Sequence, residues 1–439
     1  MIFFFLLIAG LTFLCGSGVA LFPIVYGICI VAVFATSTIL QDRYPYHRVS
    51  LLIVSSSTLL AVLIGEIVLR VAWDEKLYYR SHEKFFERST EYEGRYRYTP
   101  NISTTRRIYG DLAAISGEPK DKVFRNERFV TDDRGFRNFT PDNPSEPTKI
   151  LILGDSYGVG SDTTQELTWP VLLRQNLGGD VRNLSLPGSP ADELYTLLTE
   201  LPNLSLSKDA VVVWMIFSGN DLKESFRSLD LMEDIERRRL PFFDSLMVKI
   251  LNFHHRSALS RLIEASRAKE TKRRVEYLSV GGKDRILVYR PHLEMSKLTR
   301  HEVEQLPAFN SFTATMEKMK ETSCKNGFSV LVVLAPSKEE VYARANASVE
   351  QSAVAASVSS LCRRLSFEVL DLGPIMVRAS NDKSLWWRDD THWNAEGNSV
   401  AAEAIGARLK NGLTASPSCD KTHDETRDGR HLRTFRLLP

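Results

Sequence analysis

Cysteine is scarce in this 439-residue chain, and neither sign of charge is in clear excess. The five cysteines show no C-x-x-C spacing, which argues against a disulfide framework or a zinc ribbon. The 56 Lys and Arg residues are almost balanced by 54 Asp and Glu, and the net charge of +2 offers no electrostatic footprint for nucleic acid. We therefore expect no nucleic-acid partner, no metal and no cofactor.

Charge is absent altogether from residues 1–40, which contain no Asp, Glu, Lys or Arg. Forty helical residues would measure ~60 Å, about twice the hydrocarbon core of a bilayer, so one spanning helix cannot use them all. A third apolar run, 49–73, follows a polar loop at 41–48. A signal peptide would need a basic start and a small-residue cleavage site, whereas this chain opens Met-Ile-Phe-Phe. The pattern predicts a transmembrane region over 1–73 with two to three helices.

The loop at 41–48 also predicts an orientation. It carries Arg43 and Arg48, and short loops rich in Arg and Lys tend to stay in the cytoplasm. The third span then leads outward. We expect a multi-pass membrane protein whose partner is the lipid bilayer and whose remaining chain, after Trp73, is extracytoplasmic.

The rest of the chain divides by composition. Residues 74–148 mix charges with aromatics and end in a Pro/Asp/Asn cluster, so we interpret them as a juxtamembrane neck and linker. Residues 149–412 form the main domain, and the charged tail 413–439 is expected to be disordered. Within the domain, short apolar runs of strand type alternate with helical patterns. The predicted strands are 149–154, 181–186, 210–217, 329–335 and 367–372, and the predicted helices are 168–177, 191–201, 309–324, 349–365 and 395–410.

Strands that are apolar on both faces and alternate with helices indicate a parallel sheet covered on both sides. The fold class predicted is α/β, a three-layer α/β/α flavodoxin-like sandwich with a five-stranded parallel sheet. One insertion, at about 222–305, interrupts it. Apolar residues within 242–263 recur at three- and four-residue spacing, which is typical of an amphipathic helix. That helix could be a lid, a membrane-surface contact, or a helix packed on the domain.

Polar residues with catalytic potential follow several of these strands. Ser156 lies in a Gly-Asp-Ser string directly after the first strand, where a tight turn can expose a nucleophile to a base. Gly188 follows the second strand and Asn220 the third, and a backbone N–H and an amide both suit an oxyanion hole. Asp389 precedes His392 by three residues, a spacing at which a carboxylate can orient an imidazole.

These four strings, in this order, resemble the SGNH hydrolases, also called GDSL esterases and lipases, and in particular their membrane-anchored bacterial members. The resemblance covers roughly 149–412. It implies Ser156 as nucleophile, His392 as base and Asp389, not Asp390, as the acid that orients it. It also implies an oxyanion hole made by the N–H groups of Ser156 and Gly188 and by the Asn220 side chain. Two positions depart from the family pattern: Ser218 replaces a usual Gly, and Tyr157 follows the nucleophile.

The resemblance implies a membrane-anchored serine esterase or O-acyltransferase that acts on acyl esters, with acetyl esters of carbohydrate expected. Two alternatives stay open. One is a lipase-like esterase for long acyl chains, with helix 242–263 as its lid. The other is a membrane scaffold or carbohydrate-binding protein that keeps the fold without catalysis.

Overall fold

The computed structural model describes most of the chain after residue 83. The described ranges are 84–139, 147–178, 181–224, 235–255, 274–280, 284–344 and 351–412, with single residues at 232 and 258 and part of a helix between 53 and 69. The predicted transmembrane region and tail therefore lie largely outside the described residues. Within those residues, the structure contains no helix with the length and apolar character needed to cross a membrane.

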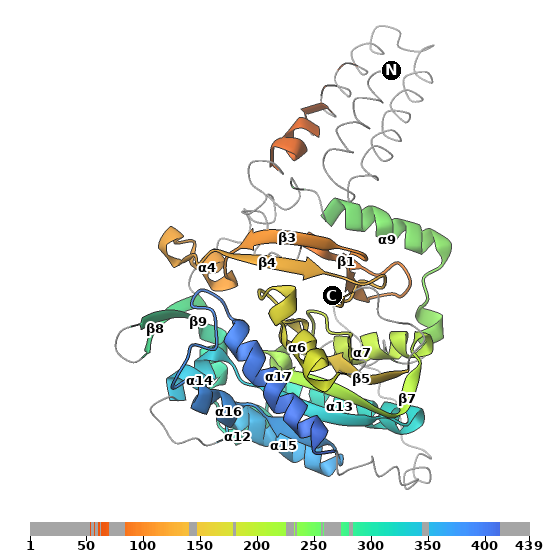
Figure 1. Ribbon diagram of the computed structural model, residues 1–439. Coiled ribbons are helices and arrows are strands. Elements are labelled where there is room, and N and C mark those ends of the chain that lie inside the picture. Colours follow the sequence, from red (N-terminus) through yellow and green to blue (C-terminus); the bar gives the residue numbers. More distant parts are fainter. Residues whose placement is uncertain are drawn as a thin grey trace, which may run out of the picture.

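A five-stranded parallel sheet forms the centre of the molecule (Figure 1). Its order is β11-β10-β7-β5-β6, the flavodoxin-like order, so this part of the prediction is confirmed. The strands are β5 (Thr148–Leu153), β6 (Val181–Asn183), β7 (Leu206–Phe217), β10 (Ser329–Ala335) and β11 (Glu368–Asp371). Because all five run in one direction, their carboxyl ends meet at one edge of the sheet.

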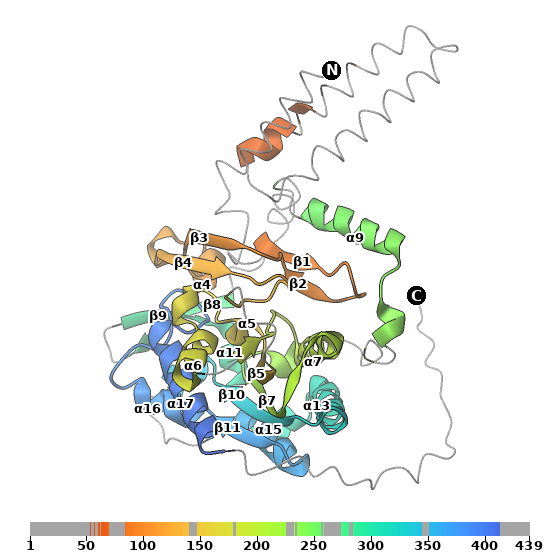
Figure 2. The same ribbon diagram turned by 45° about the vertical axis from the view of Figure 1, so that its right-hand side comes forward.

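The described part of the segment predicted as a neck, residues 84–139, is instead part of the folded domain. It forms two antiparallel hairpins, β1–β2 and β3–β4, which lie beside the sheet domain in both views (Figures 1 and 2). Tyr98, Phe129 and Phe136 of this segment are fully buried in the same core cluster as Leu153 of the central sheet. Its elements are β1 (Phe86–Arg88), β2 (Tyr96–Tyr98), β3 (Ser103–Ile108), α4 (Asp111–Ser116), a 3-10 turn (Pro119–Asp121) and β4 (Arg125–Val130).

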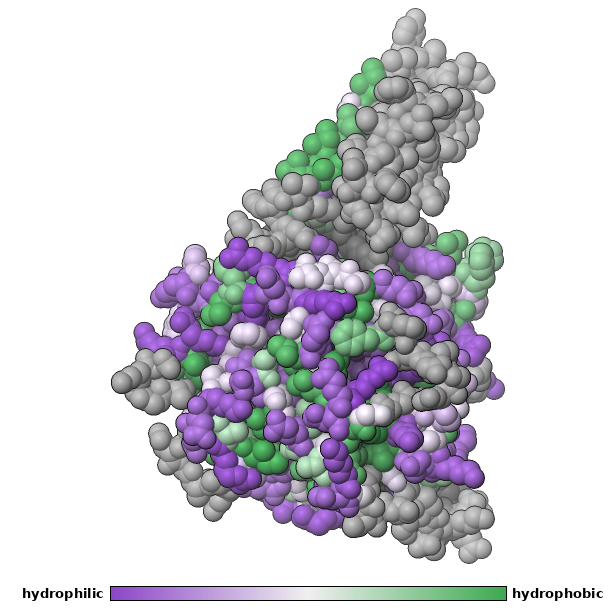
Figure 3. All heavy atoms as spheres, viewed as in Figure 1, coloured by the Kyte–Doolittle hydropathy of each residue, from purple (hydrophilic) through white to green (hydrophobic). Residues whose placement is uncertain are grey.

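The insertion also folds onto the domain. Its hairpin, β8 (Val275–Val280) and β9 (Asp284–Tyr289), packs on α4 through Leu287. The predicted amphipathic helix is α9 (Phe242–His255), and Asn252 of α9 hydrogen-bonds the backbone N–H and C=O of Arg88. The first turns of α9 expose four large apolar side chains, and the hydrophobic colour gathers there in Figure 3; they are Phe242, Phe243, Leu246 and Met247. The insertion ends with α11 (Arg290–Met295) and α12 (Arg300–Glu304).

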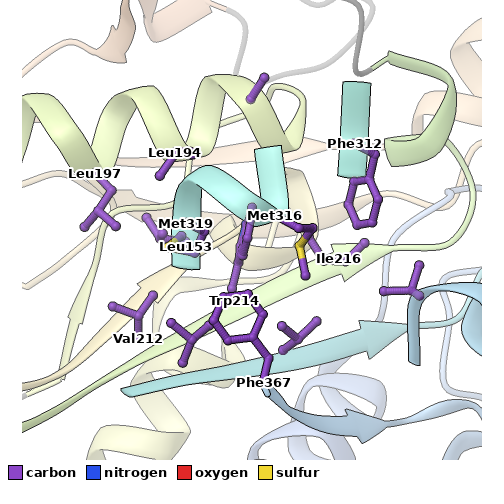
Figure 4. Packing of buried hydrophobic residues seen from close by; sticks show 14 of the residues in the cluster. Leu153, Leu194, Leu197, Val212, Trp214, Ile216, Phe312, Met316, Met319 and Phe367 are labelled. Carbon is purple, nitrogen blue, oxygen red and sulfur yellow. The ribbon is translucent and has the colours of Figure 1, made fainter. Parts of the chain in front are cut away.

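Helices cover both faces of the sheet, because alternate residues of each strand face opposite sides. Trp214 of β7 packs against α7 and α13, whereas its neighbours Val213 and Met215 pack with α6 and α17 (Figure 4 shows the Trp214 side). One layer holds α7 (Pro190–Glu200), α13 (Pro307–Asn326) and α15 (Ala353–Arg364). The other holds α6 (Trp169–Leu177), α14 (Lys338–Arg344), α16 (Gly373–Ala379) and α17 (Ala395–Lys410). Two single-turn helices, α5 (Ser156–Val159) and α8 (Asp221–Glu224), follow β5 and β7.

The packing of Phe129 gives a direct test of this architecture. We expect Phe129→Ala to lower the free energy of unfolding of the domain by ~3–5 kcal/mol, because it removes a fully buried aromatic ring from the shared core. Chemical denaturation followed by tryptophan fluorescence measures this. Phe124→Ala, at a ring that is 43% exposed on the same segment, is the control and should cost much less. If both variants lowered the free energy of unfolding by equally small amounts, the segment would not share the core, and the prediction of a separate neck would stand.

Candidate active site

Ser156 begins α5 at the carboxyl end of β5 and is 7% exposed. Asp155 caps this turn, since its carboxylate accepts the N–H of Tyr157 at 2.8 Å. Gly158 is required by a close approach: a Cβ there would lie 2.4 Å from the Oγ of Ser185. The loop after β6 runs alongside, with Leu186 N–H donating to the Gly154 carbonyl at 3.1 Å. The turn therefore holds Ser156 in one place.

His392 meets Ser156 across 236 residues of chain, with its Nε2 2.8 Å from the Ser156 Oγ. Tyr157, which follows Ser156 in the chain, holds the two residues in this contact. Tyr157 donates its hydroxyl hydrogen to the carbonyl of Thr391 and accepts the indole N–H of Trp386 at 3.2 Å. Tyr157, a departure from the family pattern, thus links the nucleophile turn to the histidine loop.

Of the two adjacent aspartates, Asp390 is the one that contacts the His392 ring, which contradicts the prediction of Asp389. Asp390 Oδ1 lies 2.7 Å from His392 Nδ1 and also accepts the backbone N–H of His392 at 2.9 Å. This is an Asx-turn, in which a carboxylate binds the N–H two residues later. The prediction assumed that a three-residue spacing folds back best, but the Asx-turn does this with two.

Asp389 points the other way, toward the amino-terminal segment. Its Oδ2 accepts the backbone N–H groups of Gly110 and Val123, each at 2.8 Å. A Cβ at Gly110 would lie 2.0 Å from the Asp389 carbonyl oxygen, so only glycine allows this approach. Asp389 is therefore an anchor of the acid loop on residues outside the sheet domain.

Arg125 of β4 connects both carboxylates. Its guanidinium donates to Asp390 Oδ2 at 2.8 Å and to Asp389 Oδ1 at 3.2 Å, and its Nε donates to the carbonyl of Asp162 at 3.0 Å. Burial works against the charged guanidinium, yet the carboxylates outweigh burial and raise the pKa of Arg125. No sequence signal marked Arg125, because it lies in the segment interpreted as a neck.

Asp162 is a second carboxylate at the same imidazole and was also missed. Its Oδ2 lies 3.1 Å from His392 Nδ1, slightly farther than the oxygen of Asp390. Asp162 is buried and has a φ of 62°, in the left-handed region that non-glycine residues seldom occupy. Such strain is found preferentially at functional sites. The sequence offers only a weak hint, an Asp in a short glycine-rich turn after the nucleophile.

The carboxylates of Asp162 and Asp390 determine the pKa of His392. Burial would lower the pKa of His392, but the hydrogen bonds and charges of Asp162 and Asp390 outweigh it and raise that pKa well above its usual value. Burial opposes ionisation of Asp390 as well, yet the contact with His392 holds its pKa below the usual range. The pKa of Asp162 is raised, first by burial and then by the neighbouring charge of Asp390.

The predicted oxyanion residues lie at the ends of neighbouring strands. Gly188 follows β6 and Asn220 follows β7, the strands on either side of β5. Asn220 Oδ1 is buried and has no hydrogen-bond partner among the described residues. Ser218, the other departure from the family pattern, gives its hydroxyl hydrogen to Glu340 at 2.6 Å. The end of β7 is thereby fixed to α14.

Lys338, the first residue of α14, binds the backbone of the loop that carries Asp389 and Asp390. Its Nζ donates to the carbonyls of Trp387, Arg388 and Asp390, at 2.7, 3.0 and 3.1 Å. Burial lowers the pKa of Lys338 to about 8. Because Glu340 of the same helix holds Ser218, one short helix braces both the acid loop and the strand end that carries Asn220.

Three of these groups could also be considered as metal ligands. Within the described part of the chain, Asp111, Asp390 and His392 bring ligand atoms within 4.8 Å of one another. Both oxygens of Asp111 accept from Thr391, at 2.9 and 2.7 Å, and Asp390 is engaged by His392 and Arg125. The three side chains therefore complete a hydrogen-bond network, and a metal would have to displace it.

A serine at the carboxyl end of a central strand, in contact with a histidine that itself contacts a carboxylate, is the arrangement found in serine hydrolases. The GDSL-like Lipase/Acylhydrolase family matches residues 152–400, more than half of the chain, and the chain belongs to this family. It is an enzyme of the class that hydrolyses ester bonds. A comparison with curated proteins finds no match.

Solved structures of the same class are similar at low identity. A lipolytic protein of the G-D-S-L family from Desulfitobacterium hafniense is 15% identical, with a TM-score of 0.31 over 60% of this chain and 99% of that one. Another such protein, from Veillonella parvula, is 11% identical, with a TM-score of 0.33 over 61% and 100%. A carbohydrate esterase family 2 enzyme from Corynascus thermopiles is 11% identical, with a TM-score of 0.31 over 66% and 76%.

The two adjacent aspartates should separate activity from stability. We expect Asp390→Asn to lower kcat by ~10²–10⁴, because the imidazole loses the carboxylate that fixes its tautomer. Asp389→Asn should leave most of kcat and lower the free energy of unfolding by ~1–3 kcal/mol, since it weakens charge-assisted hydrogen bonds to Arg125 and two N–H groups. Turnover of 4-nitrophenyl acetate and thermal melts check both. A larger kcat loss for Asp389→Asn, with an unchanged melt, would contradict the geometry.

The second carboxylate predicts a pH effect. His392 must be neutral to accept a proton, and its raised pKa places the acid limb of kcat/KM above neutral pH. Asp162→Asn removes one charge, lowers that pKa, and should move the limb to lower pH by about one unit. Asn also tolerates the left-handed backbone. The control, Asp133→Asn, changes the net charge equally at an exposed site. Identical profiles for wild type and Asp162→Asn would remove Asp162 from the site.

Proposed function

We propose that the chain is a serine esterase or O-acyltransferase in which Ser156 is the nucleophile, His392 the base and Asp390 the orienting acid. The observation that carries this proposal is the continuous line of contacts from Ser156 Oγ to His392 Nε2 at 2.8 Å, and from His392 Nδ1 to Asp390 at 2.7 Å. The same series of contacts, from nucleophile to base to acid, operates in serine hydrolases of unrelated folds.

The reaction follows from these contacts. Ser156 Oγ attacks the acyl carbonyl while His392 Nε2 takes its proton. The negative oxygen of the tetrahedral intermediate rests on the N–H groups of Ser156 and Gly188 and on the Asn220 amide. His392 then protonates the leaving alcohol. Water or a sugar hydroxyl, deprotonated by the same histidine, resolves the acyl-enzyme. These groups serve hydrolysis and transfer equally, and we propose acetyl esters of carbohydrate as the substrates.

Removal of the nucleophile tests the assignment. We expect Ser156→Ala to lower kcat on 4-nitrophenyl acetate by about 10³ or more and to abolish labelling by a fluorophosphonate probe, because the attacking oxygen is gone. Ser399→Ala, on the outer side of α17, is the matched control and should be labelled like the wild type. A thermal melt excludes unfolding. Normal turnover by folded Ser156→Ala protein would overturn the mechanism.

We also propose that the enzyme is attached to a membrane, with its catalytic domain outside the cytoplasm. The uncharged stretch 1–40 and the two arginines of loop 41–48 support this. The described residues of the helix that follows expose large apolar side chains, namely Ile53, Leu60, Ile64 and Val68.

The attachment can be measured on the full chain. It should stay in the membrane pellet after extraction with alkaline carbonate, and a periplasm-active reporter fused after residue 439 should be active. Release of the chain into the supernatant would reject the anchor, and an inactive reporter on a pelleted chain would reverse the orientation.

A further inference from the structure

A cavity of about 430 Å³ lies between the β1–β2 hairpin and α7, and Gly188 forms part of its wall. We propose that this cavity is the subsite for the alcohol part of the ester and that it takes a neutral sugar unit. The inference rests on the proposed function, because it assumes that the acyl carbonyl is held at Gly188.

The loop after β6 lies between the cavity and the Ser156 turn and contacts both. Residues 186–189 line the cavity, and the same loop hydrogen-bonds to β5 beside the Ser156 turn, through Leu186 N–H and the Gly154 carbonyl. A substrate whose carbonyl oxygen meets the N–H of Gly188 therefore has this cavity directly beside its ester bond. Its volume falls within the usual range for small-molecule sites, ~300–1,000 Å³.

One wall belongs to the amino-terminal hairpin, which lies outside the family-matched region 152–400. The rings of Phe86 and Tyr96 stack there at a centroid distance of 5.2 Å. Tyr195 of α7, on the opposite side, donates its hydroxyl hydrogen to the Glu93 carbonyl at 2.9 Å and ties the two walls together. Figures 1 and 2 both show the hairpin over α7. Aromatic rings offer an apolar surface on which the C–H face of a sugar ring can pack.

The other lining groups select a polar but uncharged ligand. Arg95 is buried and paired with the buried Glu200, so its charge is already neutralised. Burial, reinforced by the charge of Asp155, raises the pKa of Glu193 well above its usual value, which favours the neutral acid. The carboxylate of Asp192 accepts the backbone N–H and the hydroxyl hydrogen of Ser189, at 3.0 and 2.8 Å. A long acyl chain would desolvate these groups without replacing their hydrogen bonds, and an anion would be repelled by Asp192.

Thr196→Met in the full-length chain tests the cavity by filling it. The Oγ1 of Thr196 only back-bonds to the Asp192 carbonyl, so its loss leaves the helix intact. We expect the ratio of the KM for a partially O-acetylated cello-oligosaccharide to the KM for 4-nitrophenyl acetate to rise roughly tenfold or more, because only the sugar needs the space. Thr322→Met is the matched control: Thr322 is 4% exposed against 5% for Thr196, and it makes the same back-bond on α13. Both KM values should be unchanged in the control.

A binding measurement separates this inference from the proposed function. In calorimetric titration, the Ser156→Ala protein should bind the acetylated cello-oligosaccharide, and the Ser156→Ala/Thr196→Met protein should bind it roughly tenfold more weakly. An acetylated oligo-uronate should bind more weakly than the neutral sugar. If the sugar bound in this way but the wild-type protein turned over no ester, the proposal of a sugar subsite would stand and the proposal of an esterase would be rejected. The sugar subsite would be rejected if the wild type turned over 4-nitrophenyl acetate and Thr196→Met left the ratio of the two KM values unchanged. It would also be rejected if Thr196→Met raised only the KM for 4-nitrophenyl palmitate.

Discussion

The burial of three carboxylates on and beside the loop that carries His392 is the constraint on which the rest of the site depends. Asp389, Asp390 and Asp162 are all removed from water, and an isolated buried charge is strongly unfavourable. His392 contacts the carboxylates of Asp390 and Asp162, and Arg125 contacts those of Asp389 and Asp390 and also the backbone carbonyl of Asp162. The surroundings of His392 therefore depend on a guanidinium from β4, a strand outside the central sheet.

The sequence was sufficient to predict the parts that rest on local pattern. Continuous apolar runs alternating with helices predicted the five parallel strands, and their order follows from the flavodoxin-like class. Ser156 and His392 were predictable because a strand end and a loop before the last helix restrict where they can lie. The 2.8 Å contact between them agrees with that expectation.

The remaining parts depend on contacts between distant residues, which one sequence does not reveal. The difference between Asp389 and Asp390 lies in their neighbours: Asp389 binds the N–H groups of Gly110 and Val123, whereas Asp390 binds His392 and Arg125. The strands of the amino-terminal segment are short and show no regular pattern of polar and apolar residues, so the sequence of this segment does not predict a fold. Its burial depends on the surface that the sheet domain offers to Tyr98 and Phe129.

The family-matched region 152–400 therefore does not contain all the residues that contact Asp389 and Asp390. It contributes Ser156, His392 and Asp390, but Oδ2 of Asp390 accepts from the N–H of Asp111 and from Arg125, which both lie outside it. The same amino-terminal segment builds one wall of the cavity beside Gly188. A single segment thus contacts the acid at one end and the cavity at the other. Variation in it could change both the basicity of the histidine and the substrate without any change in the family's own motifs.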